Sequence, residues 1–153
     1  MLGLAIALSL QEQGFGTYGE NIFWNKSPVL ASGSVVGDSG LWVNSLPESI
    51  SGDLYTDNVT VSTRFTDPLK QGLYMLQLLN LFRTAWFDNC ELTTKPISDV
   101  TFTNVEILKG TSVSLEAVDN EGKWVQAIRF QVRYKLPTDL PPLESVSGNN
   151  SRQ

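Results

Sequence analysis

The sequence predicts an α+β fold in which an antiparallel sheet is packed on one side by two helices, with a long loop or arm between the first strands. Two segments repeat apolar residues at helical spacing, several later segments alternate strictly, and a Gly/Ser/Asp-rich stretch lies between them. The 153 residues, 41% hydrophobic and 18% charged, suit one globular domain. We expect that domain over 1–136, with 32–57 as the projecting loop or arm and 137–153 as a disordered tail.

Two helices are predicted. Leu2, Ile6 and Leu10 recur every four residues, with Leu4 and Leu8 beside them, which predicts an amphipathic helix over 1–13 that ends at the following glycines. In the second helix, predicted over 68–86, Asp67 is the expected N-cap and Pro68 the first helical residue. Its apolar residues, expected to lie on the sheet, are Leu69, Leu73, Leu76, Leu79 and Phe82, with Tyr74, Leu78 and Leu81 beside them.

The strands are predicted from alternation. A short strand is expected at 21–24, one within the arm at 41–46, and a half-buried one at 58–65. The C-terminal half contributes strands at 100–109, 111–118 and 123–136, the last with its apolar side chains on one face and its charged ones on the other. The apolar face of this last strand comprises Ile128, Phe130, Val132 and Tyr134.

Residues suited to catalysis are scarce. The chain has no histidine and a single cysteine, Cys90, so histidine acid–base chemistry, common zinc sites and an intramolecular disulfide are excluded. The Gly-x-Gly-x-x-Gly spacing at 14–19 closes a helix, whereas a dinucleotide fingerprint opens one. The aspartates are scattered among predicted turns. We therefore expect a protein that is not an enzyme and that has no cofactor and no bound metal.

The candidate functional residues are contact residues. Arg129, Arg133 and Lys135 lie on the solvent-exposed face of the last strand. They form a solvated charged face, pair with acidic side chains of a neighbouring subunit or, as the least favoured alternative, bind DNA directly. Trp42 is either an interface anchor or a residue that packs under the arm. The predicted subunit or partner interface comprises Trp42, Asp53, Asp57, Glu106, Glu116, Arg129, Arg133 and Lys135.

The sequence from Gln13 to Phe23, QGFGTYGENIF, resembles the opening of the phage minor-capsid family, in which a helix ending near EQGLG leads through GTxxF into a strand. The strand at 59–65 followed by the Asp67-Pro68 helix start extends this likeness. The order of elements over 2–136 is similar to lambda-like tail terminators, although only 13–23 and 59–82 are motif-like. The segments 41–57 and 91–100 are longer than that family requires.

The resemblance implies a structural virion protein made in the host cytoplasm, with no membrane association. It implies a tail terminator that forms a homohexameric ring at the head-proximal end of the tail and contacts the tail tube and neck or connector proteins. The net charge of −5 suits a ring through which phage DNA passes without specific binding. The alternatives are another neck, connector or minor capsid protein, or a non-viral module that holds a small ligand in an apolar pocket between helix and sheet.

The apolar stretch at 2–10 could be mistaken for a signal peptide. It has no positively charged segment before it and no small-residue cleavage site after it. It is also too short to span a bilayer. We expect the protein to remain in the cell that makes it.

Overall fold

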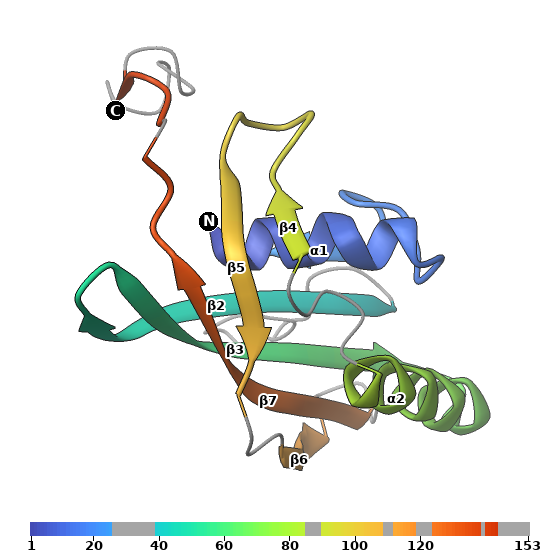
Figure 1. Ribbon diagram of the computed structural model, residues 1–153. Coiled ribbons are helices and arrows are strands. Elements are labelled where there is room, and N and C mark those ends of the chain that lie inside the picture. The colour runs from blue at the N-terminus through green and yellow to red at the C-terminus, as the bar shows by residue number, and fades with distance from the viewer. Residues whose placement is uncertain (26–38, 85–89, 109–111, 119–123, 139, 144–153) are drawn as a thin grey trace.

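The structure is a computed structural model and is shown in Figure 1. It describes residues 1–25, 39–84, 90–108, 112–118, 124–138 and 140–143.

In the described residues, seven strands form one sheet in the order β1-β2-β3-β7-β5-β4, and β6 also pairs with β7. The first pair, β1 with β2, is parallel, and the other pairs are antiparallel. Strand β7 is central because β3 pairs along one of its edges while β6 and β5 divide the other edge between them. The strands are β1 (Ile22–Trp24), β2 (Gly40–Ser51), β3 (Leu54–Phe65), β4 (Cys90–Thr93), β5 (Thr101–Ile107), β6 (Ser112–Val118) and β7 (Trp124–Lys135).

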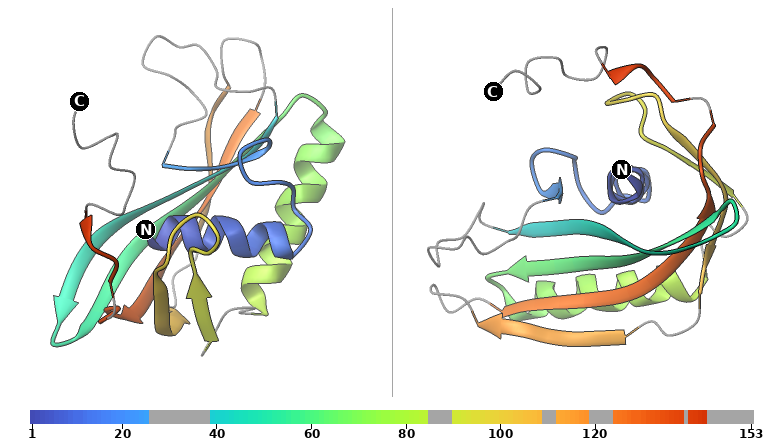
Figure 2. Two further views of the ribbon diagram at one scale, coloured as in Figure 1. Left: turned by 90° about the horizontal axis from the view of Figure 1, so that it is seen from above. Right: turned by 90° about the vertical axis from the view of Figure 1, so that its left-hand side faces the viewer.

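The sheet curls around helix α1 (Leu2–Glu12), as the right-hand view of Figure 2 shows along the helix. Residues 2–8 and Leu10 are all buried, so the helix is apolar around most of its circumference. A helix of this kind needs cover on several sides. Strands β1 and β2 lie against it on one side and β4 on another, which produces a half-barrel with α1 in its hollow.

The predicted fold class is wrong. The sheet is mixed and curled into a half-barrel. Strands dominate the part of the chain that the structure describes, which has two helices of 11 and 16 residues and seven strands. The two helices do not form a layer on a flat sheet, because α1 lies inside the curl and α2 crosses one end of the sheet (Figure 1). The prediction read α1 as an amphipathic helix, with Leu4 and Leu8 beside the face formed by Leu2, Ile6 and Leu10. It therefore missed that the helix is buried around most of its circumference.

The main hydrophobic cluster lies on the concave face of the sheet, while Trp42, Val125 and Ala127 are buried on the other face. Alternation places the odd-numbered residues of β3 and the even-numbered residues of β7 on the concave face, where the two strands are paired over their whole length. Ile128, Phe130, Val132 and Tyr134 are all buried, which confirms the face predicted for the last strand. Both helices contribute to the same hydrophobic cluster.

Helix α2 (Pro68–Arg83) begins as predicted. Asp67 is its N-cap, accepting a hydrogen bond from the Leu69 amide at 3.0 Å, and Pro68 follows it. The buried face of the helix comprises Gln71, Met75, Leu78 and Phe82.

The predicted sheet-facing side of α2 is partly wrong. Leu69, Leu73 and Leu76 are 82%, 56% and 66% exposed, whereas Phe82 is buried against Phe130 with ring centroids 4.4 Å apart. The buried Gln71 explains the difference. Its Nε2 donates to Thr63 Oγ1 at 2.5 Å and to Gln126 Oε1 at 2.9 Å, so the helix is held to the sheet through a polar contact that an apolar pattern does not reveal.

The predictions for the arm, the remaining strands and the tail are also met only in part. Of the predicted arm at 32–57, residues 32–38 lie outside the described residues, and most of the remainder is strand, forming the β2–β3 hairpin with Gly52 and Asp53 at its turn. Strand β4 was not predicted. Of the predicted tail, residues 139 and 144–153 lie outside the described residues.

The close fit of α1 generates a prediction. A Cβ atom added at Gly3 would lie 2.9 Å from Trp24 Cδ1 and 3.1 Å from Ser45 Oγ, so Gly3→Ala should lower the free energy of unfolding by about 1 kcal/mol through overpacking. Gly72→Ala is the matched control, because no atom lies within 4 Å of an added Cβ there. It should raise the free energy of unfolding by about 1 kcal/mol through helix propensity. Denaturant unfolding at low protein concentration measures the change in the free energy of unfolding for each variant. Changes of the same sign for Gly3→Ala and Gly72→Ala would contradict the prediction.

Candidate functional site

One end of the half-barrel holds a cavity of about 250 Å³, here called the apolar hollow. It is surrounded by the start of α1, the middle of β2, the first part of β3, the start of β5, the end of β7 and the segment that follows β7. It is lined by Met1, Leu2, Ser45, Pro47, Asp57, Val100, Phe102, Tyr134, Leu136, Pro137 and Leu140. Most of these side chains are apolar, so the hollow suits an apolar group.

A buried polar pair lies in this hollow. Asp57 occupies an inward position of β3 and is 4% exposed, and Tyr134 Oη donates a hydrogen bond to its Oδ1 at 2.9 Å. Burial raises the pKa of Asp57, although the hydrogen bond from Tyr134 and the Met1 amino group both act in the opposite direction. Burial and the neighbouring carboxylate raise the pKa of Tyr134, so its hydroxyl remains a donor. The Tyr134 ring is held edge-to-face against Phe102.

Helix α2 carries a second apolar surface, the leucine ridge, formed by Leu69, Leu73 and Leu76. These residues stand at i, i+4 and i+7 and therefore share one side of the helix. The opposite side of the helix is the one that contacts the sheet through Gln71, Met75, Leu78 and Phe82. Three adjacent exposed leucines form a contiguous apolar patch of the kind that marks contact sites on soluble proteins.

The convex face of the sheet carries a row of polar contacts across neighbouring strands. Arg133 forms an ion pair with Glu106, and Lys135 Nζ lies 3.6 Å from Asp53 Oδ2. Next to these, Gln131 Nε2 donates to Asn58 Oδ1 at 3.2 Å. Four of the eight predicted contact residues are thus brought together, but as partners within one chain. Exposed pairs of this kind contribute about 0–1 kcal/mol each to stability.

The other predicted contact residues are dispersed. Trp42 is fully buried and stacks on Phe23 with ring centroids 5.4 Å apart, so packing within the domain accounts for it. Asp57 lies in the apolar hollow, and Arg129 is exposed on β7. Glu116 belongs to β6, and its side chain lies outside the described residues.

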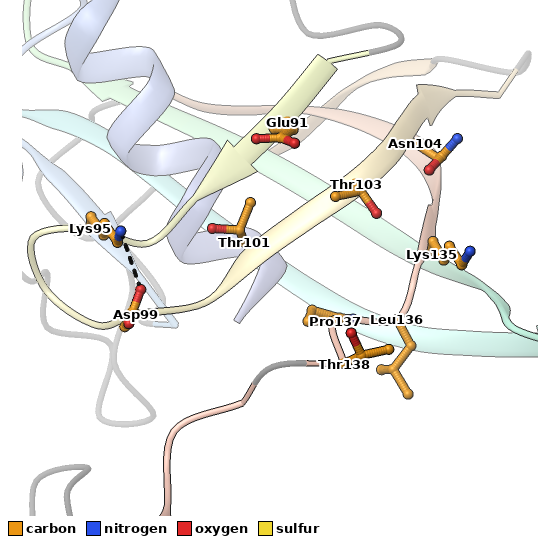
Figure 3. Close-up of a pocket in the computed structure, with 10 residues that line it drawn as sticks. All are labelled: Glu91, Lys95, Asp99, Thr101, Thr103, Asn104, Lys135, Leu136, Pro137 and Thr138. Atoms are coloured by element: carbon orange, nitrogen blue, oxygen red, sulfur yellow. Dashed lines mark ion pairs between the residues drawn. The ribbon is translucent and has the colours of Figure 1, made fainter.

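A polar pocket of about 740 Å³ lies between the β4–β5 hairpin and the end of β7 (Figure 3). Thr101 and Thr103 of β5 and Lys135 and Leu136 at the end of β7 line it together with the hairpin loop. Lys95 and Asp99 in that loop form an ion pair at 3.5 Å. Because positive and negative side chains alternate around the pocket, it offers no single charge for a ligand to match.

Within the described ranges, no three His, Cys, Asp or Glu side chains are grouped to share a metal ion. Neither α1 nor α2 has the length and apolar character that crossing a bilayer requires.

Comparison with known proteins finds no protein-family model and no curated protein that matches this chain.

Sequence reasoning missed the apolar hollow and the outward direction of the leucine ridge. A signal for the ridge was present, since α2 has apolar residues on two opposite sides, which is more than one buried face needs. No such signal marks the hollow. It is formed by residues from both ends of the chain that only the curl of the sheet brings together.

The buried carboxyl of Asp57 generates a prediction about pH. Its folded-state pKa is raised above the ordinary value of 3.8, so its contribution to stability is complete below that value and is lost as the pH rises through the raised pKa. Asp57→Asn, which keeps an acceptor for Tyr134 without a charge, should therefore raise the melting temperature at pH 7.5. The gain should shrink as the pH falls toward 4.

Thermal unfolding across this pH range measures the effect. Asp53→Asn is the control, because Asp53 is an exposed carboxylate on the same hairpin. It should change the melting temperature little at either pH. An Asp57→Asn protein that is less stable than wild type at pH 7.5 would contradict the prediction.

Proposed function

We propose that this chain is a non-enzymatic structural subunit of a tailed-phage particle, a tail terminator that forms a ring at the head-proximal end of the tail. The observation that carries the proposal is the leucine ridge. Burying a leucine side chain contributes about 2 kcal/mol, so an ordered helix with three exposed leucines on one side gains substantially from contact with another protein surface. The likeness of residues 13–23 and 59–82 to the minor-capsid and tail-terminator families supplies the virion context.

The mechanism of such a subunit is geometric. Copies related by rotation bind one another through the same two surfaces, and the ring closes when the rotation does. The faces of the ring then contact the tail tube and the neck or connector proteins. The net charge of −5 disfavours adhesion of DNA phosphates, which suits a passage for the genome. The subunit is made in the host cytoplasm and ends in the virion, as a hexamer if it follows the family.

A small-ligand module is the alternative function, and the apolar hollow is the observation that favours it. Its volume of about 250 Å³ is smaller than the roughly 300–1,000 Å³ typical of small-molecule sites. The larger pocket of about 740 Å³ is polar and does not lie between a helix and the sheet. The expected apolar pocket of a ligand-binding module is therefore matched less well than a protein contact.

The ridge generates a prediction about assembly. Leu76→Glu places a charge in the contact and should weaken self-association by at least 30-fold, which corresponds to about 2 kcal/mol. Leu46→Glu is the matched control, because Leu46 is 71% exposed against 66% for Leu76 and lies on the convex face of the β2–β3 hairpin. It should leave association unchanged.

Sedimentation of the purified protein over a concentration series and electron microscopy of negatively stained samples measure the association. Rings with a central channel are expected for wild type, and antibody labelling should place the protein at the head-proximal end of the tail. A wild-type protein that stays monomeric at high concentration would overturn the proposed function.

A further inference from the structure

We propose that this chain binds a neutral sugar ring in a cavity between helix α2 and the turn that follows α1. The turn passes beside α2 in the left-hand view of Figure 2, and the cavity between them has a volume of about 390 Å³. That volume lies within the roughly 300–1,000 Å³ typical of small-molecule sites. The cavity is separate from the apolar hollow and from the polar pocket of Figure 3. Sugar binding is a further function, and it does not depend on whether the subunits form a ring.

The floor of the cavity is apolar. Phe15 from the turn, and Tyr74 and Leu81 from α2, are half-buried and pack against the hydrophobic cluster. The rings of Phe15 and Tyr74 meet edge to face with centroids 6.1 Å apart, and the Tyr74 ring also lies 4.4 Å from that of Phe65. Packed aromatic rings offer an apolar surface of defined geometry. One face of a pyranose ring consists of C–H groups and suits such a floor.

The rim of the cavity carries neutral hydrogen-bonding side chains. Gln13 lies on the α1 side, and Gln77, Asn80 and Thr84 lie along α2. An amide side chain both donates and accepts hydrogen bonds, as a hydroxyl group does. Among the described residues, the side chains of Gln13 and Gln77 have no hydrogen-bond partner, and both are exposed. Both amides are therefore available to the hydroxyl groups around a sugar ring, each of which also donates and accepts.

The electrostatics of the cavity favour an uncharged ligand. None of the described residues that line it carries a formal charge. Gln13 and Thr84 are the C-caps of α1 and α2, so both helices end at the rim. The carbonyl groups of a last helical turn lack donors within the helix and form the negative end of its dipole. These ends disfavour a phosphate or carboxylate, and a cationic ligand finds no carboxylate among the lining side chains.

A peptide backbone is the competing ligand, because its amide groups also donate and accept hydrogen bonds. An extended backbone presents these groups alternately to either side along a line. The polar groups of this cavity instead form a rim around one apolar floor. A single ring with an apolar face and hydroxyl groups at its edge fits this arrangement better.

Amide proton–nitrogen correlation spectra of the full chain test the proposal, with D-glucose, D-galactose and N-acetyl-D-glucosamine as probes. At least one sugar should shift the signals of residues 13–15 and 77–84 in a saturable manner. The dissociation constant should be on the order of 1 mM, because small ligands gain little free energy per atom. Sorbitol is the control ligand, since it has hydroxyl groups on every carbon but no ring, and it should cause no saturable shift. Glucose 6-phosphate should bind no more tightly than glucose.

Two substitutions, Gln13→Leu and Gln77→Leu, remove an amide while nearly keeping the size of the side chain. Each should weaken binding of the responding sugar about fivefold or more, which is the effect of losing one hydrogen bond. Because both residues are exposed, both variants should fold as wild type does, and their spectra report this directly. Gln131→Leu is the matched control: it makes the same change on the convex face of β7, outside the cavity, and should leave the affinity unchanged.

Four outcomes would overturn the proposal. The first is the absence of a saturable shift with all three sugars, and the second is equal binding of sorbitol and glucose. The third is an unchanged affinity in both glutamine variants, which would place the sugar elsewhere on the protein. The fourth is binding of N-acetylglycine N-methylamide in preference to the sugars, which would assign the cavity to a peptide. Sedimentation tests the proposed ring separately, so either idea can fail while the other stands.

Discussion

An α-helix that is apolar around most of its circumference cannot lie on a flat sheet with water on its other side. Helix α1 is such a helix, since residues 2–8 and Leu10 are all buried. The sheet meets this constraint by curling, so that β1 and β2 cover one side of the helix and β4 another. Gly3 allows the helix to approach Trp24 and Ser45 closely, and Ser45 Oγ accepts a hydrogen bond from the Gly3 amide at 3.0 Å. The half-barrel and its hollow follow from this one enclosed helix.

The curl divides the roles of the two helices. Helix α1 fills the interior, and α2 covers one end of the sheet through Gln71, Met75, Leu78 and Phe82. Because one side of α2 is sufficient for this, the leucines on its other side remain at the surface. The start of α1 leaves the opposite end of the half-barrel incompletely filled, and the hollow with Asp57 and Tyr134 lies there. Surplus apolar surface at one end and unfilled space at the other arise from the same arrangement.

Local features of the chain were predictable because they depend on neighbouring residues. The cap at Asp67, the start of α2 at Pro68 and the alternation of β7 all follow from short-range stereochemistry. The curl was not predictable, because it depends on Leu4 and Leu8 being buried together with Leu2 and Ile6. The helical repeat of apolar residues identifies one buried face of a helix and does not show that the other sides are buried too. The side of α2 that faces the sheet depends on the contacts of Gln71 with Thr63 and Gln126, which lie 8 and 55 residues away in the sequence. Of the candidate residues, only Asp57 lines the hollow, and its partner Tyr134 is 77 residues distant.

Strand β7 connects the two ends of the molecule directly. Gln126, near its beginning, accepts the hydrogen bond from α2, and Tyr134, near its end, lines the hollow. Eight residues separate them, which at about 3.3 Å per residue spans roughly 26 Å. This stretch of β7 is hydrogen-bonded to strands along both of its edges, so its length is nearly fixed. Inserting one residue without a bulge would turn every later side chain to the opposite face, so a regular strand keeps its faces only when its length changes by two residues. The distance between Gln126 and Tyr134 is therefore set by a whole number of two-residue repeats of the strand.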